Sequence, residues 1–172
     1  MSNVHSLKFR GFSREQNKWL YGFRAKSNYQ TYIADDNPAE VIHISPETAL
    51  IKFSRVESAS LGVFTCATDM AGNELYTGDV FLIIWDNQPI PDEPKLEELY
   101  VVCYDGQGFY GQGISGALSY EMFSQALLVG NTFDNPEYVE ILNYNIPKLT
   151  DEELENLKSI IESEGLKQPD NY

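Results

Sequence analysis

Three carboxylates near the middle of the chain, Asp69, Glu74 and Asp79, have the residue type that an acid–base pair or a divalent-cation site needs. A calcium loop requires oxygen ligands at positions one, three and five, and this segment lacks that spacing. A tight turn explains the same residues, because Asp69 can accept a hydrogen bond from two residues on and Gly72 supplies a positive φ. The pattern therefore favours a structural role in turns, and not a catalytic one, for four residues: Asp69, Gly72, Gly78 and Asp79.

The remaining reactive side chains are also badly spaced for chemistry. Two nitrogen and two sulfur ligands are formally enough for tetrahedral zinc, from His5, His43, Cys66 and Cys103. None of them shows the short-range Cys-x-x-Cys or His-x3–5-His spacing of a zinc site, and the two thiols are typical of buried small apolar residues. No G-x-S-x-G motif is present. The sequence therefore predicts no catalytic residue, no metal ligand and no cofactor.

A glycine-rich stretch after residue 105 superficially resembles a phosphate-binding turn. It holds five glycines, Gly106, Gly108, Gly111, Gly113 and Gly116. A dinucleotide site needs a helix directly after the glycines, and a P-loop needs Gly-Lys followed by Ser or Thr. Neither is present, so we expect a mobile loop or an irregular sheet edge.

The first 26 residues interleave basic and aromatic side chains. The basic positions, with one aromatic, form a candidate interaction surface: Lys8, Arg10, Arg14, Lys18, Trp19, Arg24 and Lys26. Basic residues that follow phosphates, beside aromatics that stack on bases, are typical of single-strand nucleic-acid binders. Two observations oppose this interpretation: the whole chain has a net charge of −14, which repels a polyanion, and the aromatics alternate as core-facing strand residues do.

The charge is unevenly distributed along the chain. Residues 1–26 hold six basic residues and one acidic residue, a net of +5, whereas residues 61–172 hold four basic and twenty acidic residues, a net of −16. Acidic residues can simply keep a Tyr-rich β protein in solution. They can also form an acidic face that meets a basic partner or a basic segment of a second copy.

The length of 172 residues, with 42% hydrophobic and 13% aromatic residues, predicts one folded domain. No apolar stretch approaches the roughly 18 to 20 residues of a membrane span, and the start lacks the pattern of a signal peptide. We therefore expect a soluble protein of the cytoplasm that contacts no membrane.

Alternating apolar residues and turn signals predict a mainly β chain. A basic β-hairpin is expected over 7–26, and short strands over 41–44 and 49–53. A two-turn hairpin is expected over 62–85, a proline-rich connection over 89–94, and further strands over 100–104 and 125–132. Capping signals predict two helices, at about 136–143 and 151–164, followed by a flexible tail over 168–172.

Three blocks of the chain resemble the YopX family of phage and prophage proteins. Residues 65–80 are similar to a family signature that begins T-G-x-x-D-x-x-G and closes on G-D. Residues 8–13 resemble K-x-R-(A/G)-(W/F)-(D/S), with Phe12 where Trp is usual. Residues 130–137, which include Gly130, Asn131, Asn135 and Pro136, resemble G-N-(I/V)-(Y/F/H)-(E/D)-N-P-(E/D). The stretches 22–60 and 86–127 match no block.

The resemblance implies a compact β-rich domain, barrel-like or with a bifurcated sheet, over residues 1–167, and a protein that self-associates. It implies no activity, because none is established for the family. With no catalytic constellation in the chain, we expect a non-enzymatic accessory protein that acts by binding in the cytoplasm of the bacterial host. Two alternatives stay open: an acidic inhibitor or decoy of a host nucleic-acid-binding or defence protein, and a single-strand nucleic-acid binder that uses the basic hairpin. A homo-oligomer with an interface within 7–26 is also expected, because opposite charges on one chain favour ordered pairing.

Overall fold

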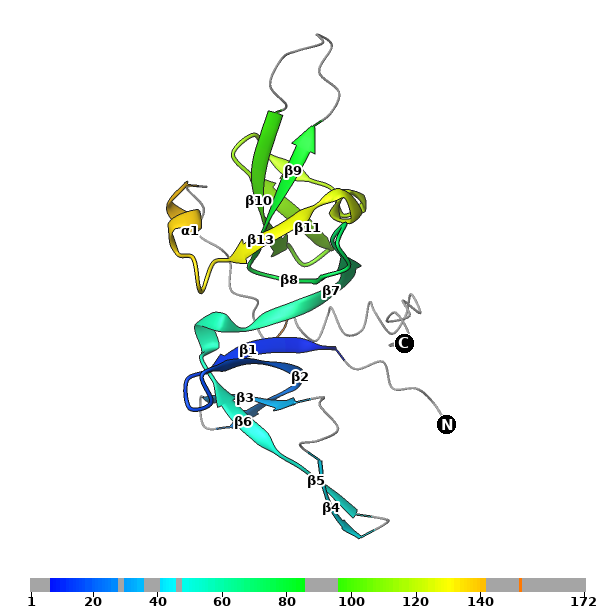
Figure 1. Cartoon of the computed structure of the whole chain (residues 1–172), viewed down its shortest axis with the longest axis vertical. Coiled ribbons are helices and arrows are strands. Elements are labelled where there is room, and N and C mark those ends of the chain that lie inside the picture. The colour runs from blue at the N-terminus through cyan, green and yellow to red at the C-terminus, as the bar shows by residue number, and fades with distance from the viewer. Residues whose placement is uncertain are drawn as a thin grey trace. The chain divides into compact units, whose positions relative to one another are not determined.

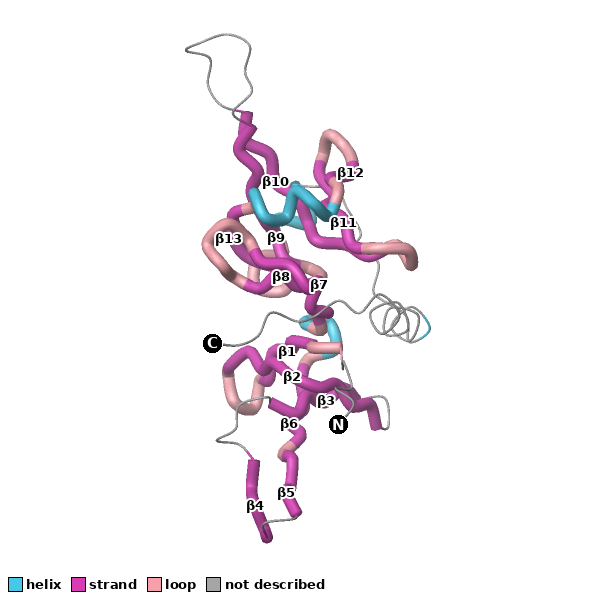
Figure 2. The backbone as a smooth tube through the Cα atoms, turned by 90° about the vertical axis from the view of Figure 1, so that its right-hand side faces the viewer, coloured by secondary structure: helices cyan, strands magenta, loops and turns pink. Residues whose placement is uncertain are grey.

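A computed structural model describes residues 7–27, 30–35, 41–45, 48–85, 96–141 and 152 of the chain. The chain divides into two compact units, Met1–Phe64 and Thr65–Tyr172. Strands dominate the described parts of both units, and the helices are short (Figures 1 and 2). The mainly β class predicted from the sequence is confirmed, and the described strands form open sheets rather than a closed barrel. Two compact units can still fold as one domain, so the single domain stays a prediction.

The first unit is built from antiparallel strands and one 3-10 helix. Its elements are β1 (Phe9–Ser13), β2 (Lys18–Ser27), β3 (Gln30–Asp35), β4 (Val41–Ser45), β5 (Thr48–Ile51), β6 (Phe53–Val56) and η2 (Ser58–Ser60). The strand β7 (Gly62–Thr68) begins in this unit, where Val63 pairs with Phe9, and continues into the second unit. A six-stranded sheet has the order β6-β3-β2-β1-β7-β8, and β4 and β5 form a separate pair.

The basic hairpin expected over 7–26 is present as β1 and β2. Their register places Phe12 opposite Trp19 across a short turn, and Asn17 takes the left-handed conformation there with φ 51°. The sheet curls, because the backbone N–H of Glu57 donates to the Phe12 carbonyl over 2.9 Å. Gly11 permits this curl, since a Cβ at that position would lie 2.8 Å from Cγ2 of Val56.

One face of this curled sheet is the core of the first unit. Alternate residues from the paired strands fill it: Leu7, Phe9, Leu20, Ile33, Val56 and Val63. We call this surface the inner face. Because strand residues alternate between faces, the residues between these positions must lie on the opposite side of the sheet.

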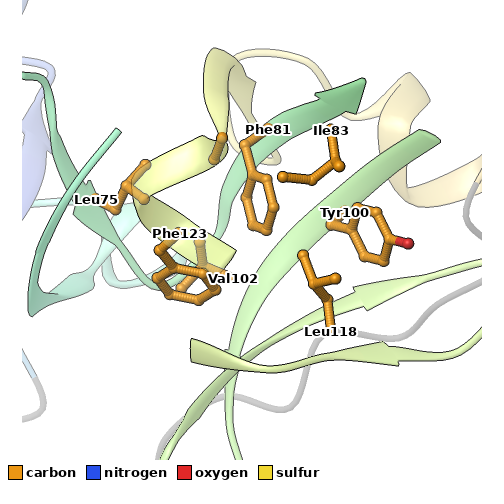
Figure 3. Packing of buried hydrophobic residues seen from close by; sticks show 8 residues of the cluster. Leu75, Phe81, Ile83, Tyr100, Val102, Leu118 and Phe123 are labelled. Atoms are coloured by element: carbon orange, nitrogen blue, oxygen red, sulfur yellow. The ribbon is translucent and has the colours of Figure 1, made fainter. Parts of the chain in front are cut away.

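The second unit carries a five-stranded antiparallel sheet in the order β12-β11-β10-β9-β13. Its elements are β8 (Glu74–Tyr76), β9 (Asp79–Trp85), β10 (Leu96–Tyr104), β11 (Phe109–Gly113), β12 (Ala117–Leu118), η3 (Tyr120–Gln125), β13 (Leu127–Asn131) and α1 (Glu137–Ile141). In its core Phe81 stacks on Tyr100, with ring centroids 5.6 Å apart, and meets Phe123 edge-on at 5.3 Å (Figure 3). The short helix η3, which the sequence did not predict, delivers Phe123 to this core.

For the glycine-rich stretch the sequence predicts a mobile loop or an irregular sheet edge, and the structure shows that its central part is regular sheet next to the edge strand β12. Residues 109–113 form β11, which pairs with β10 on one side and with β12 on the other. Gly111 and Gly113 are needed for close packing, because a Cβ at Gly111 would lie 2.7 Å from Cζ of Phe81 and one at Gly113 would lie 2.6 Å from Cε1 of Tyr100. These glycines therefore serve the core, not a phosphate.

The Gly111→Ala variant is expected to unfold more easily by about 1–3 kcal/mol, because the added methyl group overpacks a filled core. Gly108→Ala is the matched control, since a Cβ there would meet no atom within 4 Å. Chemical denaturation of both variants measures the difference. Equal free energies of unfolding for the two would show that the ring of Phe81 moves aside at little cost.

The C-terminal part is described only in part. The helix expected at about 136–143 is present as α1, whose Tyr138 packs on Val80, Val101 and Cys103. The expected helix over 151–164, the tail over 168–172 and the proline-rich connection lie outside the described residues, apart from residue 152. Within the described ranges no helix has the length and apolar character for a membrane crossing.

Candidate binding surface

The face of the first sheet opposite its core is rich in exposed aromatic rings. The registers of β2 with β3 and of β3 with β6 place Phe23, Ala34 and Phe53 in one row across three strands. Directly opposed residues share a face, so both phenyl rings project from the same side, one to each side of the buried Ala34. Phe23 is 47% exposed and Phe53 is 48% exposed. Two large apolar side chains are thus presented to solvent by neighbouring strands.

The hairpin adds a cation and further rings to this side. Tyr21, which is 37% exposed, lies opposite Arg10. The guanidinium carbon of Arg10 lies 4.9 Å from the ring centroid of Trp19, and Trp19 meets Phe12 edge-on at 5.8 Å. A guanidinium at this distance from an indole forms a cation–π contact. Arg10 is only 7% exposed, and its contact with Trp19 helps to hold it in place.

More basic residues flank the rings. Arg55 is exposed and lies opposite Tyr32, which lies opposite Ala25. The ammonium of Lys8 lies 6.0 Å from the ring centroid of Phe64. We call this surface the outer face and define it by the following residues: Lys8, Arg10, Phe12, Trp19, Tyr21, Phe23, Tyr32, Ala34, Phe53 and Arg55.

The structure divides the candidate surface predicted from the sequence between the two sides of the sheet. Lys8, Arg10 and Trp19 belong to the outer face. The three basic residues of β2 lie at even-numbered positions and point to the opposite side of the sheet: Lys18, Arg24 and Lys26. The guanidinium carbon of Arg24 lies 6.0 Å from the Phe9 ring, which belongs to the inner face. The alternation of strand residues causes this division.

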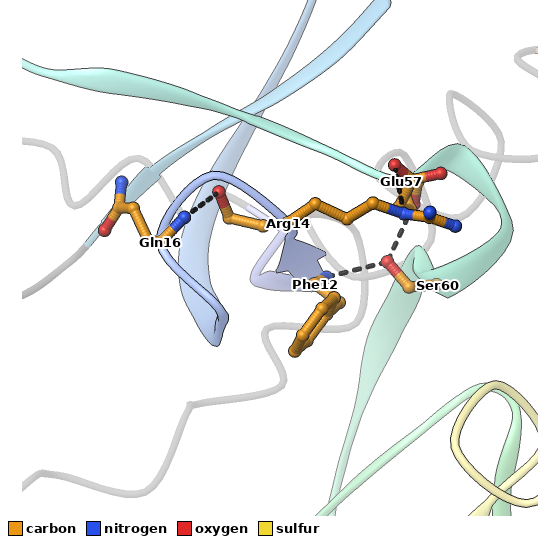
Figure 4. A network of polar contacts seen from close by, with 6 residues as sticks. Phe12, Arg14, Gln16, Glu57 and Ser60 are labelled. Carbon is orange, nitrogen blue, oxygen red and sulfur yellow. Dashed lines mark hydrogen bonds and ion pairs between the residues drawn. The ribbon is translucent and has the colours of Figure 1, made fainter.

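Arg14 belongs to neither face, because it lies in the turn after β1. Its Nε is 2.9 Å from a carboxylate oxygen of Glu57 (Figure 4), and its side chain is mostly exposed. Nearby, the backbone N–H of Phe12 donates to Oγ of Ser60 over 2.7 Å, and that hydroxyl donates to the Glu57 carbonyl over 2.7 Å. These bonds fix the turn against the start of η2.

The expectation that the hairpin aromatics all face the core is wrong for most of them. Phe9 is buried on the inner face, but Tyr21 and Phe23 are exposed on the outer face. Sequence reasoning also missed four outer-face residues that fall in a stretch without a family block, namely Tyr32, Ala34, Phe53 and Arg55. The alternation of Phe53 and Arg55 was a usable signal, but only the strand pairing shows that these residues join the hairpin.

The two units differ in net charge. Residues 1–64 hold eight basic and six acidic residues, a net of +2, and residues 65–172 hold four basic and twenty acidic residues, a net of −16. The aromatic outer face therefore lies on the only unit with a positive net charge.

Asp69 is a buried carboxylate that organises the turn between β7 and β8. One oxygen accepts the backbone N–H groups of Ala71 at 2.9 Å and Asn73 at 2.8 Å. The other accepts the side-chain amide of Asn73 at 3.0 Å and the backbone N–H of Leu128 at 3.0 Å. Desolvation raises the pKa of Asp69, but the bonds from Leu128, Asn73 and Ala71 outweigh it and leave the pKa below its ordinary value. The Asp69 carboxylate thus has a structural role, because its hydrogen bonds connect this turn to β13.

The other signature residues also lie in turns. Gly72 and Gly78 have φ of +87° and +85°, values that favour glycine. The carboxylate of the buried Asp79 accepts the backbone N–H of Tyr76 over 2.7 Å. In the block over 130–137, the side-chain oxygen of Asn131 accepts the backbone N–H groups of Phe133 at 3.0 Å and Asp134 at 2.9 Å.

The remainder of that block leads into α1. The side-chain oxygen of Asn135 lies 3.5 Å from the backbone N of Asn131, and a Cβ at Gly130 would lie 2.5 Å from the same oxygen. Pro136 directly precedes the helix, a position that suits its fixed φ. Gly130, Asn131 and Asn135 thus form one compact turn between β13 and α1.

The residues considered as metal ligands are not brought together in the part of the chain that the structure describes. No group of three His, Cys, Asp or Glu side chains is placed there to hold a metal ion. Cys66 and Cys103 are free thiols, and burial raises the pKa of Cys66. His5 lies outside the described residues.

Comparison with known proteins identifies the family of this chain. The crystal structure of protein EF1440 from Enterococcus faecalis is similar over 77% of this chain and 97% of that chain, with 19% sequence identity and a TM-score of 0.43. No curated protein matches the sequence. The model of the family described as "YopX protein" matches residues 8–140, which include the outer face and all three signature blocks. The chain belongs to the YopX family.

Proposed function

We propose that this YopX-family chain is a non-enzymatic phage or prophage protein that acts by binding in the host cytoplasm, and that the outer face is its binding surface. The observation that carries the proposal is the row formed by Phe23, Ala34 and Phe53, with both rings about half exposed. A rigid sheet presents these rings, so little ordering is lost when a ligand covers them. Large exposed rings beside cations are more typical of a recognition surface than of a solvated strand.

A capture experiment with the full chain tests this proposal. The double variant Phe23→Asp/Phe53→Asp removes the exposed rings, and Ile114→Asp is the control, because Ile114 is a 71% exposed residue of the second unit. Each protein is immobilised and exposed to a bacterial extract, and both retained proteins and retained nucleic acids are identified. We expect a constituent that the wild type and the control retain and the double variant loses. Equal retention by all three proteins would contradict the outer face as the binding surface.

The acidic second unit supports a second candidate function. A net charge of −16 over residues 65–172 suits an inhibitor or decoy that occupies a basic site on a host protein. In the same experiment this function predicts a basic protein that is released by added salt and is retained equally by the wild type and by Phe23→Asp/Phe53→Asp. Retention that depends on the two phenyl rings instead assigns binding to the outer face.

Self-association through the basic hairpin is a further prediction. Light scattering at low salt should give a mass well above the 19.5 kDa of one chain. Arg10 is a poor choice for charge reversal because it is buried against Trp19. Arg14→Glu/Lys18→Glu is preferable, since both side chains are exposed, and it should lower the mass by placing acids opposite acids. A monodisperse monomer at micromolar concentration would contradict the prediction.

A further inference from the structure

We infer that the outer face binds single-stranded nucleic acid; this inference rests on the proposed function and names its ligand. A single strand offers unpaired base faces and a line of phosphates. The outer face offers a matching pair of features, exposed rings and neighbouring cations, on one side of one sheet.

The rings are placed to stack on successive bases. Tyr21 and Phe23 are two residues apart on β2 and so project from the same side roughly 7 Å apart along the strand. Phe53 lies two strands away from Phe23, roughly 10 Å across the sheet. Aromatic side chains on a sheet surface accept bases by stacking, and every base has a face that suits them. Ala34, which is buried between the phenyl rings, projects no bulky side chain between them and a base.

The cations lie where a backbone that follows these bases would pass. Arg55 is two residues after Phe53 on β6 and therefore projects from the same face. Lys8, which is half-buried, lies two residues before Arg10 at the other side of the row. Arg10 itself is only 7% exposed and holds Trp19 in place rather than contacting phosphate. Guanidinium groups pair with phosphate oxygens in fixed geometry. The net charge of +2 on residues 1–64, against −16 on the remainder, directs a polyanion to this unit.

The same features disfavour other ligands. A duplex keeps its base faces stacked inside, so the exposed rings would have nothing to cover, and none of the short helices described is carried by the outer face to enter a major groove. A protein partner would use the rings as apolar area, for which an aliphatic side chain of similar size is an adequate substitute. The need for a flat π face thus distinguishes a base from a protein side chain.

Fluorescence anisotropy with labelled oligonucleotides tests the inference. The probes are oligothymidylate and oligouridylate of about 15 nucleotides and a DNA duplex of equal length. We expect the full chain to bind both single strands at micromolar concentration or below and the duplex at least about 10-fold more weakly. Raising the salt from roughly 50 to 200 mM should weaken binding about 7-fold, as two phosphate contacts would give.

Variants of one ring separate stacking from simple apolar contact. Phe23→Ala should weaken binding about 10-fold, within the range that one stacked base contributes, and Phe23→Leu should weaken it nearly as much. Phe23→Trp should retain the affinity because it keeps a π face, and Ile114→Ala in the second unit should leave it unchanged. Thermal unfolding checks that each variant is folded. Because Phe23 is half exposed, the folded state should persist in all of them.

Three results would overturn the inference: no binding of either single strand, equal binding of the duplex, or full affinity in Phe23→Leu or Phe23→Ala. The extract experiment separates this failure from that of the proposed function. If Phe23→Asp/Phe53→Asp still loses a captured protein while no oligonucleotide binds, the outer face is a binding surface for protein and only the ligand assignment is wrong.

Discussion

Asp69→Ala is expected to lower the free energy of unfolding by about 2–3 kcal/mol, because four N–H groups then lose a charged acceptor that is itself buried. Four N–H groups donate to this carboxylate, and the one from Leu128 ties the turn to β13, 59 residues away in sequence. Chemical denaturation measures the loss. The binding of ligand by the outer face, measured under conditions where the variant is folded, should not change, because Asp69 lies in the second unit.

Asp105→Ala is the matched control for this variant. The Asp105 carboxylate likewise accepts two backbone N–H groups, from Gln107 at 2.9 Å and Gly108 at 3.1 Å, but its turn is exposed. Water can replace an exposed acceptor, so the expected loss is below about 1 kcal/mol. Losses of equal size at Asp69 and Asp105 would show that the link to Leu128 contributes little.

The stability that Asp69 provides should depend on pH with a definite sign. Its pKa is lowered in the folded chain, so the unfolded chain takes up the proton first as the pH falls. The contribution is complete above the unfolded-state pKa of about 3.9 and is lost as the pH falls through the lower folded-state value. The difference in stability between the wild type and Asp69→Ala should therefore shrink below about pH 4.

Asp79→Ala is expected to have the second largest effect, a loss of about 2–3 kcal/mol in the free energy of unfolding. Asp79 is buried at the start of β9, and its carboxylate accepts the backbone N–H of Tyr76. Removing the acceptor leaves a buried donor where the chain reverses between β8 and β9. Thermal unfolding measures the loss, and any binding by the outer face should be retained in the folded fraction. A fully stable Asp79→Ala variant that selectively loses binding would instead place Asp79 in a functional site.

Local turn chemistry explains which parts of the fold could be predicted from the sequence. The hairpin of β1 and β2 and the turn around Gly72 depend on residues close together in the chain, so their position could be predicted. Other elements depend on tertiary packing and could not be predicted. No residue close to Gly111 in the sequence indicates that the absence of a side chain there makes room for the ring of Phe81. The sequence therefore predicts a mobile loop or an irregular sheet edge where the structure has the regular strand β11.

The candidate surface could also be predicted only in part, because some of its features depend on neighbouring residues and others on strands that are distant in the sequence. The alternation in β2 correctly separates two faces, but both faces carry apolar residues, Leu20 on one and Phe23 on the other. Only the curl of β6 back to β1 decides which face is covered. The contribution of Phe53 and Arg55 also depends on β6 pairing with β3, which no local pattern specifies.

Photo-cross-linking with mass-spectrometric mapping tests the central claim most directly. A single-stranded oligonucleotide with photoreactive bases is bound to the full chain, irradiated and digested, and the modified residues are identified. The account predicts cross-links on Tyr21, Phe23 and Phe53, the exposed rings of the outer face, and their loss when unlabelled single strand competes. Cross-links confined to residues 65–172, or spread evenly over both units, would contradict the outer face as the binding surface.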